Sequence, residues 1–437
     1  MRNYGLLITL AVALAAPRIG WTGEDPFADL ETPKPAGKSD DPFADLEGKK
    51  NEEPKKTQAT PLKARPIEDK GFFKDNFTFK KEVYSQFTYS DLEEKPHHIY
   101  SRQSVGFEIL KKFSTKTATV AAFNLQARLV RRDNFIDTPN DAEGREREGW
   151  FLEYHNVYWD FYNFLNPALG EAKGDHIGRF NFRLGRFYLP FGLNLQTDTH
   201  GTLLQLSNDR NFGFERDWYA GLWGALNQDI NYDVYYLLGA GYDLSFKGQK
   251  GLIGSRFSLA NKYFVEHGIE GGVSFMYGER LSWHALEHSA SVERASEGNK
   301  IVDTLRYGLD FRYTRSVPTG SVKFTTEISA GKDEGDEVFT LLHQLGYLHR
   351  SRRFGADVQY RRFWQNMVLG APSLGNTHAP ASSKADASVS GEFTWYFRND
   401  IGNNNLHWIK LNAERELEYH QDRKLDTKVT LQYYRYW

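Results

Sequence analysis

From residue 77 to its end, the chain consists mostly of long stretches in which apolar and polar side chains alternate. Residues 305–313, for example, carry Leu, Tyr and Phe at odd positions and Arg, Gly or Asp at even positions. Because successive side chains of a β-strand point to opposite faces, such a strand has one apolar and one polar face. Many runs reach about nine residues, the length of a tilted strand that crosses a bilayer, whereas strands in soluble sandwiches average about five or six. The pattern therefore predicts strands that face lipid on one side and water on the other.

The number of these runs predicts the kind of sheet that they form. Segments rich in Gly, Asn, Asp and Pro separate them, as in an antiparallel meander. Roughly sixteen runs are present, an even number in the range of closed barrels that enclose water. We therefore expect an all-β fold, a transmembrane antiparallel β-barrel of about 16 strands within residues 71–437. The expected strands lie within residues 83–89, 100–109, 117–129, 150–158, 180–184, 219–225, 230–238, 253–259, 269–277, 305–313, 322–330, 339–347, 354–362, 385–397, 409–417 and 425–437.

Composition agrees with a barrel and excludes several other classes of protein. Aromatic residues make up 15% of the chain although its mean hydropathy is only -0.61, which fits strands with one lipid face and aromatic girdles. Beyond the first 16 residues, no apolar run is long enough for a spanning helix, which needs about 18 residues. The net charge of -2 offers no basic field for nucleic acid. The absence of cysteine excludes disulfides, thiolate metal sites and a cysteine nucleophile.

The N-terminus has the features of a secretory signal peptide, which we place at residues 1–23. Arg2 precedes an apolar stretch at residues 6–16, and the small-residue pattern of residues 13–15 suits a cleavage site that Pro17 leaves undefined. The alternative is an N-terminal membrane anchor, which would need a longer apolar core.

Residues 24–70 form a polar segment rich in Pro, Lys, Asp and Glu, which we expect to be a disordered periplasmic extension. The string DPFADLE occupies residues 25–31 and recurs unchanged at residues 41–47. It is either a linear motif that docks a periplasmic or cell-wall partner, or a duplication within a spacer.

The chain ends on its last expected strand, without a polar tail. Such an ending suits a barrel, because the final strand must pair with the first to leave no edge in lipid. The alternating residues Leu431 and Tyr433 with the terminal Trp437 resemble the C-terminal assembly signal of outer-membrane barrels, although Arg435 interrupts the apolar face. We therefore expect a location in the cell outer membrane, with its lipid as a partner.

A motif in the first half of the barrel region carries a family resemblance. Residues 183–193 read RLGRFYLPFGL, and the elements that carry the likeness are Gly185-Arg186-Phe187 and then Pro190-Phe191-Gly192. With residues 216–221, this stretch resembles the phosphate-selective porins O and P. The resemblance implies a sixteen-stranded porin, a homotrimer, a loop folded into the pore, and the transport of phosphate or other small anions.

The residues themselves indicate a sharp change of direction at this motif. Pro190 cannot donate a hydrogen bond to a neighbouring strand, and Gly192 tolerates positive φ, so strand pairing should end here. The following segment, residues 194–214, is too long for a tight turn and is polar. It is either a constriction loop inside the barrel or an ordinary extracellular loop.

Anion selectivity would require basic side chains on the water face of the strands, where they could replace the hydration shell of an anion. Acidic residues such as Asp310 and Glu327 share these faces, so a mixed-charge lumen is the alternative. The pore-lining candidates in the water-facing register are Arg128, Arg183, Arg306, Arg312 and Lys323.

Evidence for catalysis or metal binding is weak. Glu153 and His155 share a strand face and could form a base and its orienting group, but no serine lies in a Gly-x-Ser-x-Gly setting. His97 with His98, and the pair at residues 284 and 288, suit solvated loops better than a metal site. We therefore expect no enzyme and no cofactor.

A third class of function stays open. The segment of residues 278–300 mixes Glu, Arg, His and Ser and could form a short surface helix that binds a partner. A barrel that acts as an adhesin or scaffold would have a filled lumen, and a barrel esterase would have a Ser–His pair at its rim.

Overall fold

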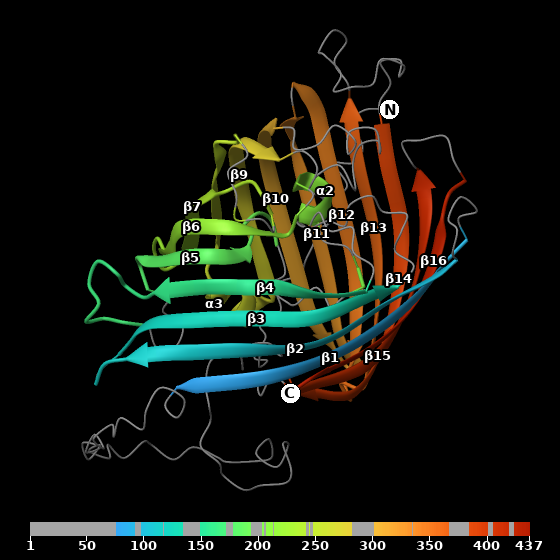
Figure 1. Cartoon of the computed structure of the whole chain (residues 1–437), viewed down its shortest axis with the longest axis horizontal. Helices are drawn as coiled ribbons and strands as arrows, with labels where there is room; N and C mark the ends of the chain where they lie inside the picture. Colours follow the sequence, from blue (N-terminus) through green and yellow to red (C-terminus); the bar gives the residue numbers. More distant parts are fainter. Residues whose placement is uncertain are drawn as a thin grey trace, which may run out of the picture.

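The computed structural model is a closed barrel of sixteen antiparallel strands (Figure 1). Each strand pairs with its neighbours in the sequence, and the first strand, β1 (Phe77–Ser90), pairs with the last, β16 (Thr427–Tyr436). The prediction of an all-β barrel with this strand number is confirmed. The structure describes residues 76–91, 98–116, 118–133, 149–171, 178–193, 203–204, 207–212, 214–241, 244, 248–281, 301–333, 335–366, 384–400, 405–418 and 424–437. The expected signal peptide, extension and DPFADLE repeats lie outside these residues.

Each alternating run of the sequence corresponds to one strand. Most strands extend beyond the runs by a few residues, whereas the strands at Ile230–Leu237 and Thr427–Tyr436 lie within theirs. Two short helices, α2 (Ser207–Phe212) and α3 (Asn261–His267), interrupt the meander. The strands are β1 (Phe77–Ser90), β2 (Ile99–Ser114), β3 (Thr119–Asp133), β4 (Gly149–Phe161), β5 (Asn181–Tyr188), β6 (Arg216–Ala225), β7 (Ile230–Leu237), β8 (Gly251–Leu259), β9 (Ile269–Leu281), β10 (Ile301–Val317), β11 (Gly320–Asp333), β12 (Asp336–His349), β13 (Phe354–Asn366), β14 (Lys384–Asp400), β15 (Asn405–Glu418) and β16 (Thr427–Tyr436).

Antiparallel pairing of β1 with β16 closes the barrel, so the sheet has no open edge at this seam. The register sets Thr88 opposite Thr430, and the two hydroxyl oxygens lie 3.0 Å apart. At the end of the seam, the amide of Lys81 donates to the carbonyl of Trp437 at 2.8 Å, and the amide of Trp437 donates back at 3.1 Å. The last residue of the chain therefore takes part in closure.

The two ends of the barrel differ in the length of their connections. One end carries the C-terminus and the tight turns at residues 226–229, 318–319 and 350–353; we call it the turn end. Connections at the other end are mostly longer, and they include residues 189–215 between β5 and β6. Transmembrane barrels have this asymmetry, with short periplasmic turns and long extracellular loops.

The alternation of the sequence appears in the burial of the side chains. On β10, Tyr307 and Leu309 lie outside and are 54% and 60% exposed, whereas Arg306 and Asp310 lie inside and are 1% and 6% exposed. Exposed aromatic and aliphatic side chains follow the outer faces of other strands, as lipid contact requires. Within the described residues, neither helix has the length and apolar character needed to span a membrane.

Candidate functional site: the barrel lumen and its inward segment

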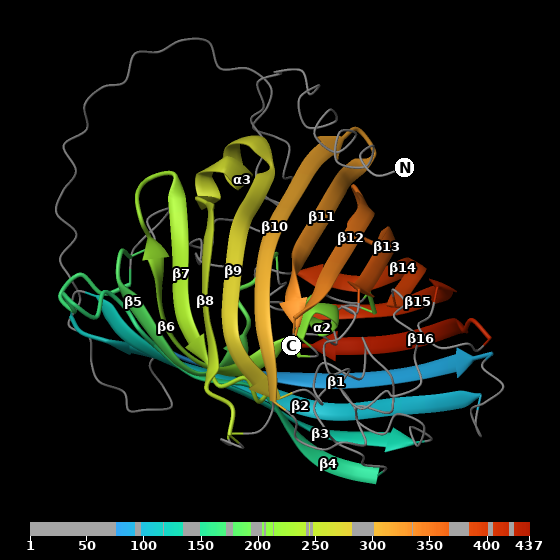
Figure 2. The same cartoon turned by 90° about the horizontal axis from the view of Figure 1, so that it is seen from above.

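The described part of the connection between β5 and β6 lies inside the barrel. Both views place α2, which belongs to this segment, inside the ring of strands (Figures 1 and 2), and α2 lies against β12. We call the described part of the connection, residues 189–193, 203–204, 207–212 and 214–215, the inward segment. Its course begins where the sequence predicted a change of direction, since β5 ends at Tyr188 and Gly192 has a φ of 68°.

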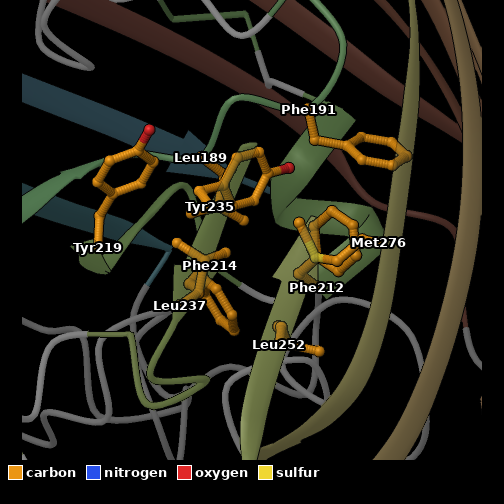
Figure 3. Close-up of a cluster of buried hydrophobic side chains, with 9 residues drawn as sticks. All are labelled: Leu189, Phe191, Phe212, Phe214, Tyr219, Tyr235, Leu237, Leu252 and Met276. Atoms are coloured by element: carbon orange, nitrogen blue, oxygen red, sulfur yellow. The ribbon is translucent and has the colours of Figure 1, made fainter. Parts of the chain in front are cut away.

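A hydrophobic cluster holds the base of the inward segment to the inner wall (Figure 3). The segment contributes four buried apolar side chains, and strands β6 to β9 contribute five. Burial of this apolar surface away from lumen water stabilises the inward conformation. The nine residues are Leu189, Phe191, Phe212, Phe214, Tyr219, Tyr235, Leu237, Leu252 and Met276.

Glycines on the inner wall make room for this cluster. A β-carbon at Gly308 would lie 2.8 Å from Cζ of Phe191, and one at Gly254 would lie 2.5 Å from the ring of Tyr235. Any larger residue would therefore displace an aromatic ring of the cluster. Gly308 and Gly254 give the wall the flat surface on which these rings pack.

Polar contacts fix the far part of the inward segment to the strands that follow along the wall, β10, β11, β12 and β14. The side-chain oxygen of Asn211 accepts hydrogen bonds from the hydroxyls of Ser329 at 2.5 Å and Thr340 at 2.8 Å. The carbonyl of Asn211 accepts a bond from Arg306 at 3.3 Å. The amide of Leu203 donates to Glu392 on β14 at 3.0 Å. The inward segment thus runs from the β5–β6 wall to β10, β11, β12 and β14.

The motif residues that suggested the resemblance surround the start of the inward segment. Gly185 has a φ of 131°, and a β-carbon there would lie 2.2 Å from the carbonyl of Val157, so only glycine fits. Arg186 is buried and donates to the carbonyls of Tyr154 and His155, each at 2.7 Å. Phe187 packs under the guanidinium of Arg183, and Phe191 belongs to the hydrophobic cluster.

The five pore-lining candidates all lie on the inner face, but each is paired with a carboxylate. Arg183 contacts Asp160 with two nitrogens, at 2.7 and 2.9 Å, and Arg306 contacts Asp333 at 2.6 Å. The remaining pairs are Arg128 with Glu82, Arg312 with Glu270 at 2.7 Å, and Lys323 with Asp357 at 3.8 Å. The five predicted pore-lining cations are therefore all members of charge pairs.

Glu153 and His155, the candidate catalytic pair, are indeed adjacent. His155 Nε2 lies 2.8 Å from Glu153, but the guanidinium of Arg128 lies 2.8 Å from the other ring nitrogen. Arg102 also contacts Glu153, at 2.9 Å. The imidazole is thus part of a network of fixed charges and is not paired with a hydroxyl nucleophile in these contacts.

The other candidate sites give little support to metal chemistry. The described residues hold no group of three or more His, Asp or Glu side chains suited to a metal ion. His98 bonds to the carbonyl of Ser90 at 3.0 Å, whereas His97 and the histidines at 284 and 288 lie outside the described residues. The partner-binding segment was expected at residues 278–300. Its first residues, as far as Leu281, belong to strand β9, and residues 282–300 lie outside the described residues.

The C-terminal residues lie where an assembly signal would be accessible. Leu431 is 49% exposed on the outer face of β16, in register with Phe87 and Leu411 on its two neighbours. The guanidinium of Arg435, which interrupts the apolar pattern, lies 5.1 Å from the ring centre of Trp437. The negative face of the aromatic ring stabilises this cation.

Several residues that organise the lumen were not predicted from the sequence. The acidic partners Glu82, Asp160 and Asp333 are on strands other than those of their bases, so no local spacing could identify them. Asn211 lies in a polar stretch that resembles any surface loop. The one available signal was the presence of Phe191, Phe212 and Phe214 in an otherwise polar connection, which indicates burial.

The structure is thus a closed sixteen-stranded barrel in which the described part of the connection between β5 and β6 lies inside the ring of strands (Figures 1 and 2). No family model matches the sequence, and no curated protein matches it. Solved structures do match in fold. Pseudomonas putida OprB superposes with a TM-score of 0.53 at 10% identity, over 83% of this chain and 94% of that one. Salmonella typhi OmpF gives 0.52 at 8% identity, over 83% and 97%. The outer membrane channel DcaP of Acinetobacter baumannii gives 0.50 at 8%, over 83% and 97%.

Proposed function

We propose that this protein is an outer-membrane porin that forms a water-filled channel for the passive diffusion of small solutes. The observation that carries the proposal is the inward segment, which is anchored by apolar contacts to β6–β9 and by polar contacts to β10, β11, β12 and β14 of a barrel whose inner face is polar. A segment held in this way narrows a lumen without breaking the wall, and a narrowed polar lumen selects solutes by size and charge. The fold likeness to OprB, OmpF and DcaP supports the same function.

The first test is single-channel recording of the purified, folded protein in planar bilayers. Stable conductance steps from the folded form, absent after heat denaturation, are expected. Folding is checked by the heat-dependent shift in electrophoretic mobility that closed barrels show. A folded barrel without steps would overturn the proposal and leave an adhesin or scaffold.

The alternative of a closed scaffold rests on one observation. Several inner side chains are almost completely covered, including Arg128 at 1%, Arg306 at 1% and Gln432 at 0% exposure. Conductance decides between the two, because a filled lumen cannot conduct.

Ion selectivity is the finer part of the proposal. The resemblance to phosphate-selective porins predicts an anion-selective channel lined by Arg128, Arg183, Arg306, Arg312 and Lys323. The carboxylate beside each of these side chains favours weak selectivity instead, since a paired cation attracts an anion less strongly than a free one. The reversal potential across a salt gradient distinguishes the two: a strong anion preference supports phosphate transport, and a value near zero supports the mixed-charge lumen.

Export and assembly follow from the same proposal. We infer that residues 1–23 direct secretion, that Leu431, Tyr433 and Trp437 are read during insertion, and that the barrel forms homotrimers. Deletion of Trp437 should reduce the amount of heat-modifiable barrel in the outer-membrane fraction.

The trimer has its own test. Native mass spectrometry of the protein in detergent should give the mass of three chains. The mass of one chain would contradict the trimer and leave the proposed channel function unaffected. The DPFADLE repeats at residues 25–31 and 41–47 are proposed to bind a periplasmic or cell-wall partner.

A further inference from the structure

Two arginine–aspartate pairs on the inner wall have the same geometry. Arg183 uses Nε and Nη2 to bind Asp160, and Arg256 uses Nε and Nη2 to bind Asp310, at 3.3 and 2.7 Å. Within the described part of the chain, Nη1 of each arginine makes no hydrogen bond. The two arginine side chains are 13% and 15% exposed, so each pair presents N–H donors held in place by its aspartate.

A carboxylate and an indole lie between the two pairs. Asp233 on β7 is directly opposite Trp223 on β6 and Arg256 on β8, and it interacts electrostatically with Arg183 and Arg256. Among the described residues, Asp233 has no hydrogen-bond or ion-pair partner. The indole N–H of Trp223 likewise has none, and its ring lies 5.2 Å from the guanidinium of Arg183.

These residues form a band at one mouth of the barrel. Five of these residues lie within three residues of a strand terminus at the turn end: Asp160, Arg183, Trp223, Asp233 and Arg256. The rings of Tyr158 and Tyr162 adjoin them, since Tyr158 is 4.7 Å from the guanidinium of Arg183 and Tyr162 is 6.3 Å from the ring of Trp223. We call this set the mouth band.

We propose that the mouth band is a binding subsite for a neutral polyhydroxylated solute, such as a sugar, on its way through the channel. This inference rests on the proposed channel function and names a class of solute for it. Hydroxyl groups on adjacent carbons can donate to the carboxylate of Asp233 and accept from Nη1 of Arg183 and Arg256. The apolar C–H face of a sugar ring can pack on Trp223.

The same geometry opposes the binding of an anion. Together with Asp310, the partner of Arg256, the band has three carboxylates, of Asp160, Asp233 and Asp310, and two guanidinium groups, of Arg183 and Arg256. An oxyanion at the free Nη1 groups would therefore lie beside Asp233, whose charge repels it. A neutral solute avoids this repulsion and still uses every donor and acceptor.

The test is the block of single-channel current by maltose, compared with a polyethylene glycol of similar mass and with inorganic phosphate. Maltose should reduce conductance and increase current noise in a saturable way. The polymer lacks adjacent hydroxyls and should act only as an inert crowding solute. Stronger block by phosphate than by maltose at equal concentration would overturn the proposal and indicate an anion site.

Four variants locate the block. Asp233→Asn and Trp223→Leu should each raise the half-blocking concentration of maltose about tenfold, the value of one charged hydrogen bond or one stacking contact. Trp223→Phe keeps a ring and should retain most of the block. Glu414→Gln removes an inner carboxylate from β15, eight strands away, and should leave the block unchanged.

The outcomes separate this inference from the channel function itself. Open steps without saturable maltose block, or equal block in all variants, would overturn the subsite and leave the porin. No steps from folded protein would remove both. Heat-modifiable mobility of every variant shows that a lost block does not reflect a lost fold.

Discussion

At the level of single residues, the face that a side chain occupies decides which substitutions the barrel tolerates. Leu309 is 60% exposed on the outer face, one residue from the almost buried Asp310. Leu309→Arg should cost roughly 2–4 kcal/mol if it lies near the bilayer midplane, because the guanidinium must enter hydrocarbon. Unfolding by denaturant in lipid vesicles measures this cost. Leu309→Phe keeps the outer face apolar and should cost little; equal costs for both would contradict the assigned face.

The pairing of inner charges leads to a second prediction at this scale. Lys410 lies 2.6 Å from Glu392, and their side chains are only 6% and 3% exposed. Lys410→Met leaves a buried carboxylate without its cation and should destabilise the barrel by about 3–5 kcal/mol. Glu392→Gln in the same chain removes that charge and should restore most of the stability. A double-mutant cycle of unfolding free energies tests the coupling, and additive effects would contradict it.

At the level of elements, the inward segment depends on contacts with two groups of strands. Asn211→Ala removes the acceptor of the Ser329 and Thr340 hydroxyls, and each lost bond is worth about 0.5–1.5 kcal/mol. The barrel should still form, since its strand pairing is unchanged, but α2 should move more freely. We expect greater open-channel noise and faster proteolysis within residues 194–214. Thr340→Val removes one of the two donors and should have a smaller effect of the same kind.

Two strand glycines, one beneath the hydrophobic cluster and one away from it, provide a matched pair of substitutions. Gly308→Ala places a β-carbon 2.8 Å from Phe191, so the ring and the inward segment must shift. Gly391→Ala on β14 places its β-carbon in open space, with nothing within 4 Å. We expect altered conductance for the first variant and wild-type conductance for the second. Identical behaviour would mean that Phe191 does not anchor the segment.

At the level of the whole molecule, closure joins residues that are far apart in the chain. Thr88 and Thr430 are 342 residues apart in sequence, and their hydroxyl oxygens are 3.0 Å apart. Because the protein has no cysteine of its own, Thr88→Cys with Thr430→Cys should oxidise to a single disulfide. The cross-linked chain should migrate faster than the reduced chain after complete unfolding. The control variant combines Thr88→Cys with Val429→Cys. These two side chains point to opposite faces of the sheet, so no disulfide should form between them; a disulfide would indicate a different register.

The barrel could be derived from the sequence because its signal is local and repeated. A strand that faces lipid on one side and water on the other must alternate, and the requirement recurs in every strand. Residues 305–313 therefore specified both the strand β10 and the faces of Leu309 and Asp310. The turn at Pro190 and Gly192 could also be predicted from the sequence. Proline lacks the backbone N–H that a strand partner needs, and glycine allows positive φ, so both effects depend only on the residue itself.

The composition of the lumen is different, because it depends on contacts between distant strands. The sequence identified Arg183 and Arg306 as lumen candidates but not Asp160 or Asp333, which neutralise them, nor the place of Asp233 between two arginines. The sequence also left the course of residues 194–214 open, and the packing of Phe191 on Gly308 and the bonds of Asn211 decided it for the described residues of this connection. The alternating pattern thus determined the strands and their faces, whereas only barrel closure, which brings distant strands to fixed registers, determined which charges are paired and where the inward segment lies.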